Sequence, residues 1–136
     1  MASYRDGNSA RVILFDTNGL MMAYQFTLDV FDEVRWLVGE YHPVILTGIV
    51  RELRQLGQGR GNNASAARYG LMLSQACEVR TCEETHTSVD DSIVRYAQET
   101  GCIVVTNDRK LRDQLLMNHI DVISLTNKKR LELIRG

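Results

Sequence analysis

Two apolar runs that each end in an aspartate constrain the fold of this chain more than any other feature. The first run ends in Phe15-Asp16-Thr17-Asn18 and the second in Thr106-Asn107-Asp108. Each has the continuous aliphatic character of a strand buried on both faces of a parallel sheet. In open α/β sheets, ligands bind at the carboxyl ends of the strands. Two acids gathered there would repel each other without a cation between them, so the pattern predicts a divalent-metal site.

Strands and helices alternate along the 136 residues. This predicts a single domain, residues 1–136, whose first ten residues form a flexible N-terminus. Alternation also favours a parallel sheet with right-handed crossovers and helices on both faces. We expect strands at 12–15, 44–47, 77–80, 102–106 and 122–125, helices at 26–39, from 48 onward, around 64–71, at 90–100 and at 111–117, a glycine-rich loop at 57–63, and one or two helical turns at 127–134.

Composition narrows the class of protein without naming a function. The net charge of −1 argues against an extensive basic coat for nucleic acid, although it leaves room for a local basic groove. The three cysteines show no ligand spacing and are interpreted as reduced thiols. The polar N-terminus does not resemble a signal peptide, and no apolar run reaches the roughly 20 residues that span a bilayer. We therefore expect a cytoplasmic protein that does not enter a membrane.

Asp16 and Asp108 have a simpler interpretation as helix N-caps, a position that aspartate fills well. The repetition of strand followed by acid favours a shared site over two unrelated caps. Thr17, Asn18 and Asn107 add hydroxyl and amide groups suited to orienting a carboxylate or a bound water. No Gly-x-Gly-x-x-Gly or Gly-x4-Gly-Lys-Ser/Thr motif occurs, so dinucleotide and Walker-type phosphate binding lose their main support.

Asp90 and Asp91 begin a helix whose core face contains Ile93, Val94 and Ala97. At about 100° per residue, Asp90 points towards that face and Asp91 towards the flank. We therefore assign Asp90 to the site. Asp91 has an alternative role in capping the helix, because Ser88-x-x-Asp91 resembles a capping box.

Glu52 falls in the first turns of the helix that follows the second strand, near the same edge of the sheet. The alternative is a solvated helix glutamate. The glycine-rich loop contains Arg60 and is flanked by Arg51, Arg54 and Arg68. This loop is either a mobile connection or a contact for a phosphate backbone.

Four phrases in this order resemble the PIN-domain nuclease superfamily: 15–18, 50–53, 89–93 and 106–111. The intervening segments look most like the archaeal branch, which includes stand-alone PIN proteins and VapC-type toxins and is related to PIN proteins of small-subunit rRNA processing. The resemblance implies a three-layer α/β/α domain with a parallel sheet of about five strands in the order 3-2-1-4-5. By position, the family's acidic quartet corresponds to Asp16, Glu52, Asp90 and Asp108, with Thr17 and Thr106 in support.

The resemblance further implies a metal-dependent endoribonuclease that hydrolyses RNA phosphodiester bonds with Mg²⁺ or Mn²⁺. The expected substrate is single-stranded or structured RNA, and an antitoxin protein and a homodimer are possible partners. Lys110 stands where many relatives carry a further acid, which changes substrate positioning at most because the quartet is intact.

Two other functions fit parts of the pattern. A non-catalytic RNA-binding or ribosome-assembly factor would keep the fold and the metal site. A haloacid-dehalogenase-type phosphatase would need an acid at position 18, where this chain has Asn18.

Overall fold

A computed structural model describes residues 11–81, 88–127 and 129–136. Six strands form one sheet in the order β3-β2-β1-β4-β5-β6. The strands are β1 (Arg11–Phe15), β2 (Tyr41–Leu46), β3 (Glu78–Arg80), β4 (Ile103–Val105), β5 (Val122–Thr126) and β6 (Arg130–Ile134). The helices are α1 (Thr17–Gln25), α2 (Val30–Val38), α3 (Thr47–Gly57), α4 (Asn62–Leu73), the short 3-10 helix η1 (Ser74–Ala76), α5 (Val89–Thr100) and α6 (Arg109–Met117).

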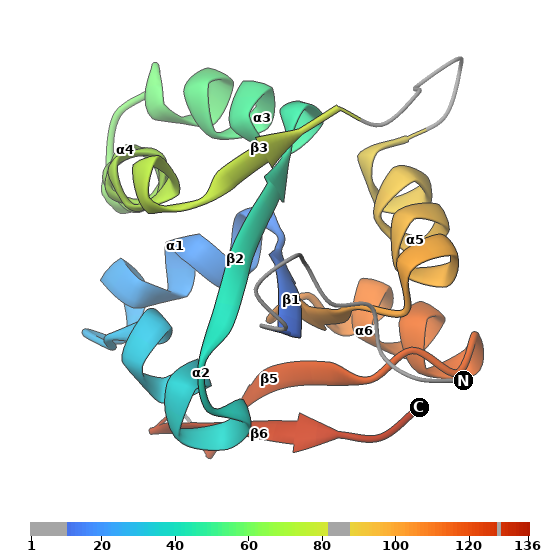
Figure 1. The fold of residues 1–136 in the computed structure, drawn as a ribbon. Coiled ribbons are helices and arrows are strands. Elements are labelled where there is room, and N and C mark those ends of the chain that lie inside the picture. The colour runs from blue at the N-terminus through green and yellow to red at the C-terminus, as the bar shows by residue number, and fades with distance from the viewer. Residues whose placement is uncertain (1–10, 82–87, 128) are drawn as a thin grey trace.

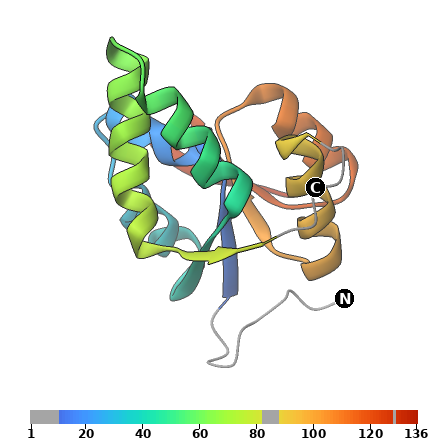
Figure 2. The ribbon, with the colours of Figure 1, turned by 90° about the horizontal axis from the view of Figure 1, so that it is seen from above.

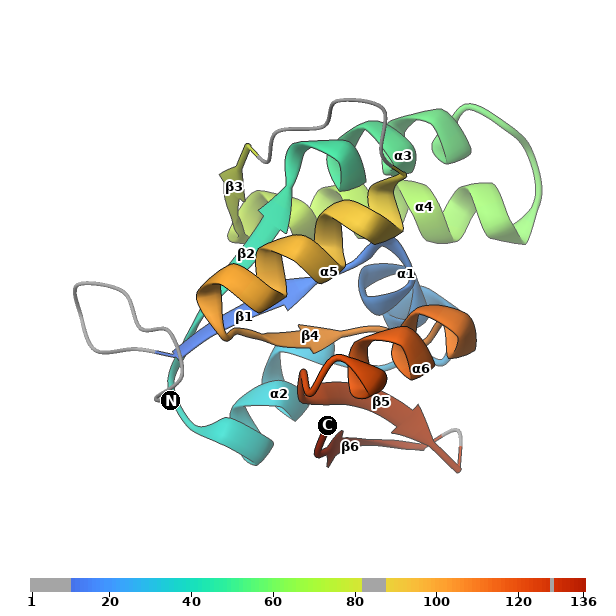
Figure 3. The same cartoon turned by 90° about the vertical axis from the view of Figure 1, so that its right-hand side faces the viewer.

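Helices cover both faces of the sheet and complete three layers. Helices α1 to α4 lie on one face, whereas α5 and α6 lie on the other (Figures 1 and 3). Seen from above, β1 runs through the middle of the molecule between these two groups (Figure 2). Right-handed crossovers produce this arrangement, because the chain first adds β2 and β3 on one side of β1 and then adds β4 and β5 on its other side.

The predicted order 3-2-1-4-5 is confirmed, and all neighbours among these five strands are parallel. Strands β1 and β4 pair directly, with Phe15 opposite Val105. The backbone N–H of Asp16 continues this pairing by donating to the carbonyl of Val105 at 3.1 Å. The two strands that end in candidate acids therefore end side by side at the centre of the sheet.

The prediction of helical turns at 127–134 is wrong, because this segment contains β6, which pairs antiparallel with β5. Leu131 and Leu133 are two residues apart and turn their side chains inward, as a strand requires, while Arg130 and Glu132 are exposed. The carboxylate of Glu33 in α2 accepts a 3.2 Å hydrogen bond from the N–H of Leu131. This contact satisfies a donor on the outer edge of the sheet.

The prediction of a single helix at 26–39 is also wrong for its first four residues. Helix α2 begins at Val30, where the side chain of Asp29 accepts from the N–H of Asp32 and caps it. Thr27 adopts a left-handed backbone with φ 49°, which interrupts any helix there. The preceding helix α1 was not foreseen.

Strand β2 begins at Tyr41, three residues earlier than expected, and includes Pro43. Strand β3 pairs with β2 only from Val44 onward. Pro43 therefore lies where β2 has β1 as its neighbour, and its missing N–H removes no bond to β3.

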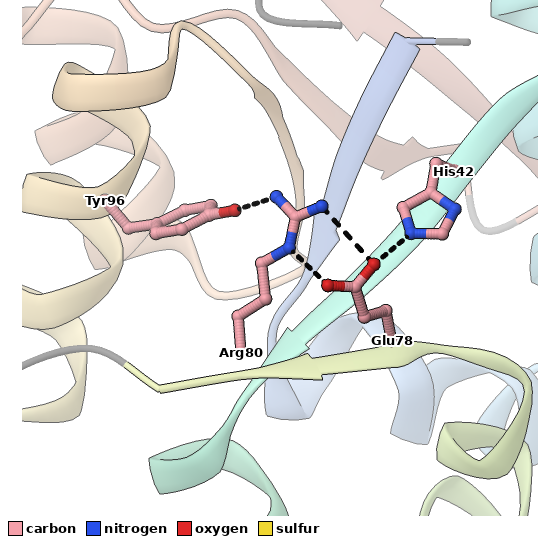
Figure 4. Close-up of polar contacts among 4 residues, drawn as sticks. All are labelled: His42, Glu78, Arg80 and Tyr96. Atoms are coloured by element: carbon pink, nitrogen blue, oxygen red, sulfur yellow. Dashed lines mark hydrogen bonds and ion pairs between the residues drawn. The ribbon is translucent and has the colours of Figure 1, made fainter. Parts of the chain in front are cut away.

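Arg80 at the end of β3 joins the sheet edge to α5 (Figure 4). Its guanidinium donates to Glu78 at 2.9 Å and to the hydroxyl of Tyr96 at 2.6 Å, and Nε2 of His42 lies 2.5 Å from Glu78. Hydrogen bonds from Arg80 and His42 lower the pKa of Glu78 to about 2. The contacts of Arg80 thus attach α5 to the sheet, and the first turn of α5 carries Asp90.

Among the described residues, no helix is both long and apolar enough to cross a membrane.

Candidate functional site

Asp16 follows β1 directly and lies almost completely buried, with 3% of its surface exposed. Its two carboxylate oxygens have separate partners. Oδ1 accepts from the N–H of Gly19 at 2.5 Å, which makes Asp16 the N-cap of α1. Oδ2 accepts from the hydroxyl of Thr106 at 2.5 Å. The carboxylate is therefore held by the first turn of α1 and by the residue that follows β4, and it has little rotational freedom.

Asp108 is held in a related way after β4. Its N–H donates to the hydroxyl of Thr106 at 3.0 Å, and its Oδ1 accepts from the N–H of Leu111 as the N-cap of α6. The capping interpretation of Asp16 and Asp108 is thus confirmed. It does not compete with a ligand-binding role, because each carboxylate oxygen has more than one lone pair.

Glu52 lies in α3, in the second turn after the end of β2. The hydroxyl of Thr17 donates to its Oε1. Because Thr17 directly follows Asp16, this bond brings the Glu52 carboxylate to the end of β1.

Asp90 and Asp91 separate as the helical spacing predicted. Asp90 is half-buried, whereas Asp91 is exposed. The side chain of Ser88 caps α5 and accepts from the N–H of Asp91 at 3.1 Å. The orientation of the two acids is therefore confirmed, while the chemical role of Asp90 stays a prediction.

The four carboxylates act on one another electrostatically. Burial raises the pKa of Asp16 to about 7, the bonds from Thr106 and Gly19 oppose this, and the charges of Asp108 and Asp90 add to it. The pKa of Asp90 is raised by burial and then by the charges of Asp108 and Glu52. The fold thus gathers Asp16, Glu52, Asp90 and Asp108 at one end of the sheet.

The remaining predicted residues form two sets: Asn18, Asn107 and Lys110 adjoin the acids, and the three arginines lie on and after α3. Asn18 and Asn107 are partly exposed beside Asp16 and Asp108. Lys110 is exposed, and its positive charge lowers the pKa of Asp90, opposing the neighbouring acids. The exposed arginines Arg51 and Arg54 lie on α3, and Arg60 lies between α3 and α4.

Gly19 is a site residue that sequence reasoning missed. A Cβ at this position would lie 2.4 Å from the carbonyl oxygen of Val105 and 3.1 Å from Oδ1 of Asp16. Only glycine lets α1 begin this close to β4 while its N–H reaches Asp16. The available signal was a glycine three residues after the acid that ends the strand.

In the described part of the chain, no group of at least three acids, histidines or cysteines is close enough together to hold a metal ion without rearrangement. The donor chemistry nevertheless fits a hard cation, because the gathered side chains offer only carboxylate oxygens. The raised pKa values of Asp16 and Asp90 point the same way, since a cation among these acids would offset their mutual repulsion.

A family model described as "PIN like domain" matches residues 12–128. The chain belongs to the PIN-like domain family. Ribonuclease VapC9 of Archaeoglobus fulgidus is 35% identical over 124 residues, which cover 90% of this PIN-like chain and 89% of that protein. Ribonuclease VapC4 of Methanocaldococcus jannaschii is 30% identical over 124 residues, covering 89% of this chain and 95% of that protein.

Solved structures share the PIN-like fold. The PIN domain endonuclease Utp24 superposes with a TM-score of 0.77 at 24% identity, and the match covers 92% of each chain. A chain of VapBC2 from Rickettsia felis, solved bound to a DNA fragment from their promoter, gives a TM-score of 0.61 at 13% identity over 85% of this chain and 99% of that one. At these identities the likeness establishes the fold alone.

Proposed function

We propose that this PIN-like domain is a metal-dependent endoribonuclease that hydrolyses RNA phosphodiester bonds. The observation that carries the proposal is the convergence of four carboxylates at the ends of β1 and β4, with Asp16 fixed between Gly19 and Thr106. Two relatives at 35% and 30% identity that are named ribonucleases support the same activity.

Asp16, Asp90 and Asp108 would hold Mg²⁺ or Mn²⁺ directly or through water, with Glu52 as a further ligand. When bound, such a cation polarises a phosphodiester and lowers the pKa of a coordinated water. The chain itself supplies the positioning. Thr106 orients both Asp16 and Asp108, and Thr17 holds the Glu52 carboxylate towards the same point, where it can orient an attacking water.

Cationic side chains around the acids would let an anionic substrate approach. Lys110 already acts on Asp90 electrostatically, and Arg51, Arg54 and Arg60 are exposed on and after α3. Single-stranded or looped RNA suits such a site because its backbone bends more readily than a duplex.

The biological setting proposed here is either a toxin or an RNA-processing nuclease. Two relatives that carry VapC names support the toxin setting, and an antitoxin partner and a homodimer follow from the resemblance to VapC-type toxins. The RNA-processing alternative follows from the resemblance to PIN proteins of small-subunit rRNA processing, and the fold shared with the endonuclease Utp24 is compatible with it.

The activity is tested with a labelled pool of single-stranded RNA. Wild type and Asp16→Asn are each incubated with it in Mg²⁺, in Mn²⁺ and in EDTA, and cleavage is measured. We expect cleavage by wild type in metal, none in EDTA, and none by Asp16→Asn. Equal cleavage by both proteins would indicate a contaminating nuclease and remove Asp16 from the site. The melting temperature gives an independent readout, since metal should raise it in wild type and EDTA should lower it.

The second candidate is a non-catalytic RNA-binding or assembly factor. It would keep the same fold and metal site, and the exposed Arg51, Arg54 and Arg60 would serve RNA contact in it as well. RNA binding by wild type and Asp16→Asn alike, without cleavage in either metal, would support this candidate.

A further inference from the structure

An open pocket of about 870 Å³ lies between the end of α1 and helix α4. Its lining residues are Ala23, Tyr24, Gln25, Thr27, Asn62, Asn63 and Tyr69. None of them belongs to the acidic quartet. Helices α1 and α4 approach closely below the pocket, where a Cβ on Gly70 would lie 3.4 Å from the Cβ of Leu20. The two walls are therefore held in a fixed relation.

Tyr24 and Tyr69 form the aromatic part of the lining. Their ring centroids are 5.9 Å apart and their planes are inclined by 49°. Tyr24 is 44% exposed and Tyr69 is 38% exposed, so the pair leaves ring surface open to the pocket. Exposed aromatic rings of this kind stack on unpaired nucleobases, which all present a π-face.

Amide groups stand beside the rings. The side chains of Gln25, Asn62 and Asn63 make no hydrogen bond to another residue within the described ranges. Carboxamides both donate and accept, which matches the polar edges of a base. Helix α4 also begins at Asn62 without a side-chain cap, so its first N–H groups are open to an anion.

Thr27 lines the pocket from the turn between α1 and α2. Its φ of 49° is rare for a β-branched residue and turns the chain away from α1 at the edge of the pocket.

Charge and position favour RNA over other ligands. The described lining contains no acid, and Arg60 lies two residues before Asn62. Helix α1 begins next to Asp16 and ends at Gln25, so its rise places the pocket about 12 Å from the acids. A strand cleaved at the acids would have neighbouring nucleotides within reach of the pocket.

We propose that this pocket binds an unstacked nucleobase of single-stranded RNA, which stacks on Tyr24 and Tyr69 and bonds to the amides of Gln25, Asn62 and Asn63. The pocket thereby selects single-stranded substrate and fixes its register relative to the acids. This inference deepens the proposed function and rests on it.

The test measures the affinity of labelled short single-stranded RNAs for Asp16→Asn, a background in which we expect no cleavage. We expect Tyr24→Ala in that background to weaken binding about 5- to 150-fold, the range of one lost base–aromatic stack. Tyr24→Phe should bind like the parent because it keeps the ring. Met117→Ala should also bind like the parent, because Met117 is 81% exposed at the end of α6, on the opposite face of the sheet.

RNAs with one abasic position moved along the strand locate the stacked base. The parent should lose affinity at one or two positions, and Tyr24→Ala should lose no further affinity at those same positions. Unchanged binding by Tyr24→Ala, or an abasic penalty that persists in it, would overturn the proposal and leave the pocket to a protein segment.

The outcomes also separate this inference from the proposed activity. Cleavage by wild type that Tyr24→Ala leaves intact, together with equal RNA affinity, contradicts the pocket alone. RNA binding through Tyr24 without cleavage by wild type contradicts the nuclease activity alone. No RNA binding by any of these proteins contradicts both.

Discussion

The hydroxyl of Thr106 donates a 2.5 Å hydrogen bond to Oδ2 of Asp16, joining residues 90 positions apart in sequence. The same hydroxyl oxygen accepts from the N–H of Asp108. One buried side chain therefore orients two of the four acids, and it can do so because β1 and β4 are neighbours in the sheet.

Thr106→Val should impair activity while preserving the shape of the residue. It removes the donor to Asp16 and the acceptor for Asp108, so both carboxylates lose a positional restraint. We expect a 10- to 100-fold loss of metal affinity or of RNA cleavage, roughly the effect of removing a group that orients a metal ligand. Metal titration followed by melting temperature, and cleavage rates, measure the two effects.

Thr106→Ser is the matched control, because serine keeps the hydroxyl and loses only a methyl group. It should retain most of the metal affinity. Equal loss in the valine and serine variants would show that packing of the methyl group, and not the hydrogen bond, explains the effect.

Gly19→Ala should destabilise the fold by about 1–3 kcal/mol, the usual range for an overpacked site. The added Cβ would meet the carbonyl of Val105 at 2.4 Å, and backbone cannot move aside as a flexible side chain does. Urea denaturation measures the change. Gly59→Ala is the control, since its nearest neighbour would be 3.7 Å away, and a similar loss there would contradict the steric explanation.

The metal-free protein should lose stability as the pH rises from about 4 to 7. The folded pKa of Asp16 is about 7 and its ordinary value is 3.8, so between these values the folded state keeps a proton that the unfolded state releases. The contribution of this retained proton to the free energy of unfolding is complete below pH 4 and lost above pH 7. The difference in unfolding free energy between these two pH values is on the order of a few kcal/mol.

Denaturation in EDTA at several pH values measures this dependence. Asp16→Asn should show a flatter profile over the same range, because asparagine does not titrate. Mg²⁺ should also flatten the wild-type profile by stabilising the charged form of Asp16. An identical slope in wild type and Asp16→Asn would assign the dependence to other groups.

The strand ends were predictable from the sequence, whereas α1 was not. Val12–Phe15 and Ile103–Val105 are uninterrupted apolar runs that stop at a polar residue, so their ends are visible in the sequence. Helix α1 lacks a comparable signal. Leu20, Met21, Met22 and Ala23 are consecutive and all buried, so no polar face marks the helical period.

The state of 130–134 depends on a partner that local pattern does not reveal. Five residues with apolar side chains at 131, 133 and 134 suit one helical turn as well as a strand. Pairing with β5 and the contact with Glu33 decide for the strand. The order of the first five strands came from the family resemblance, since spacing alone does not order a sheet.

Helical phase did distinguish Asp90 from Asp91, and the two acids should differ in the same way in their effect on activity. Asp90 is half-buried and feels the charges of Asp108 and Glu52, whereas Asp91 is exposed and its N–H is capped by Ser88. Asp90→Asn should lower RNA cleavage at least about 100-fold, since it removes a carboxylate that would hold the metal and stabilise developing charge. Asp91→Asn should leave cleavage nearly unchanged and lower the free energy of unfolding by at most about 1 kcal/mol through the helix dipole.

Cleavage rates at saturating Mn²⁺, together with unfolding free energies, measure both variants. Loss of cleavage in Asp91→Asn with activity retained in Asp90→Asn would exchange their roles and would require α5 to turn relative to the sheet.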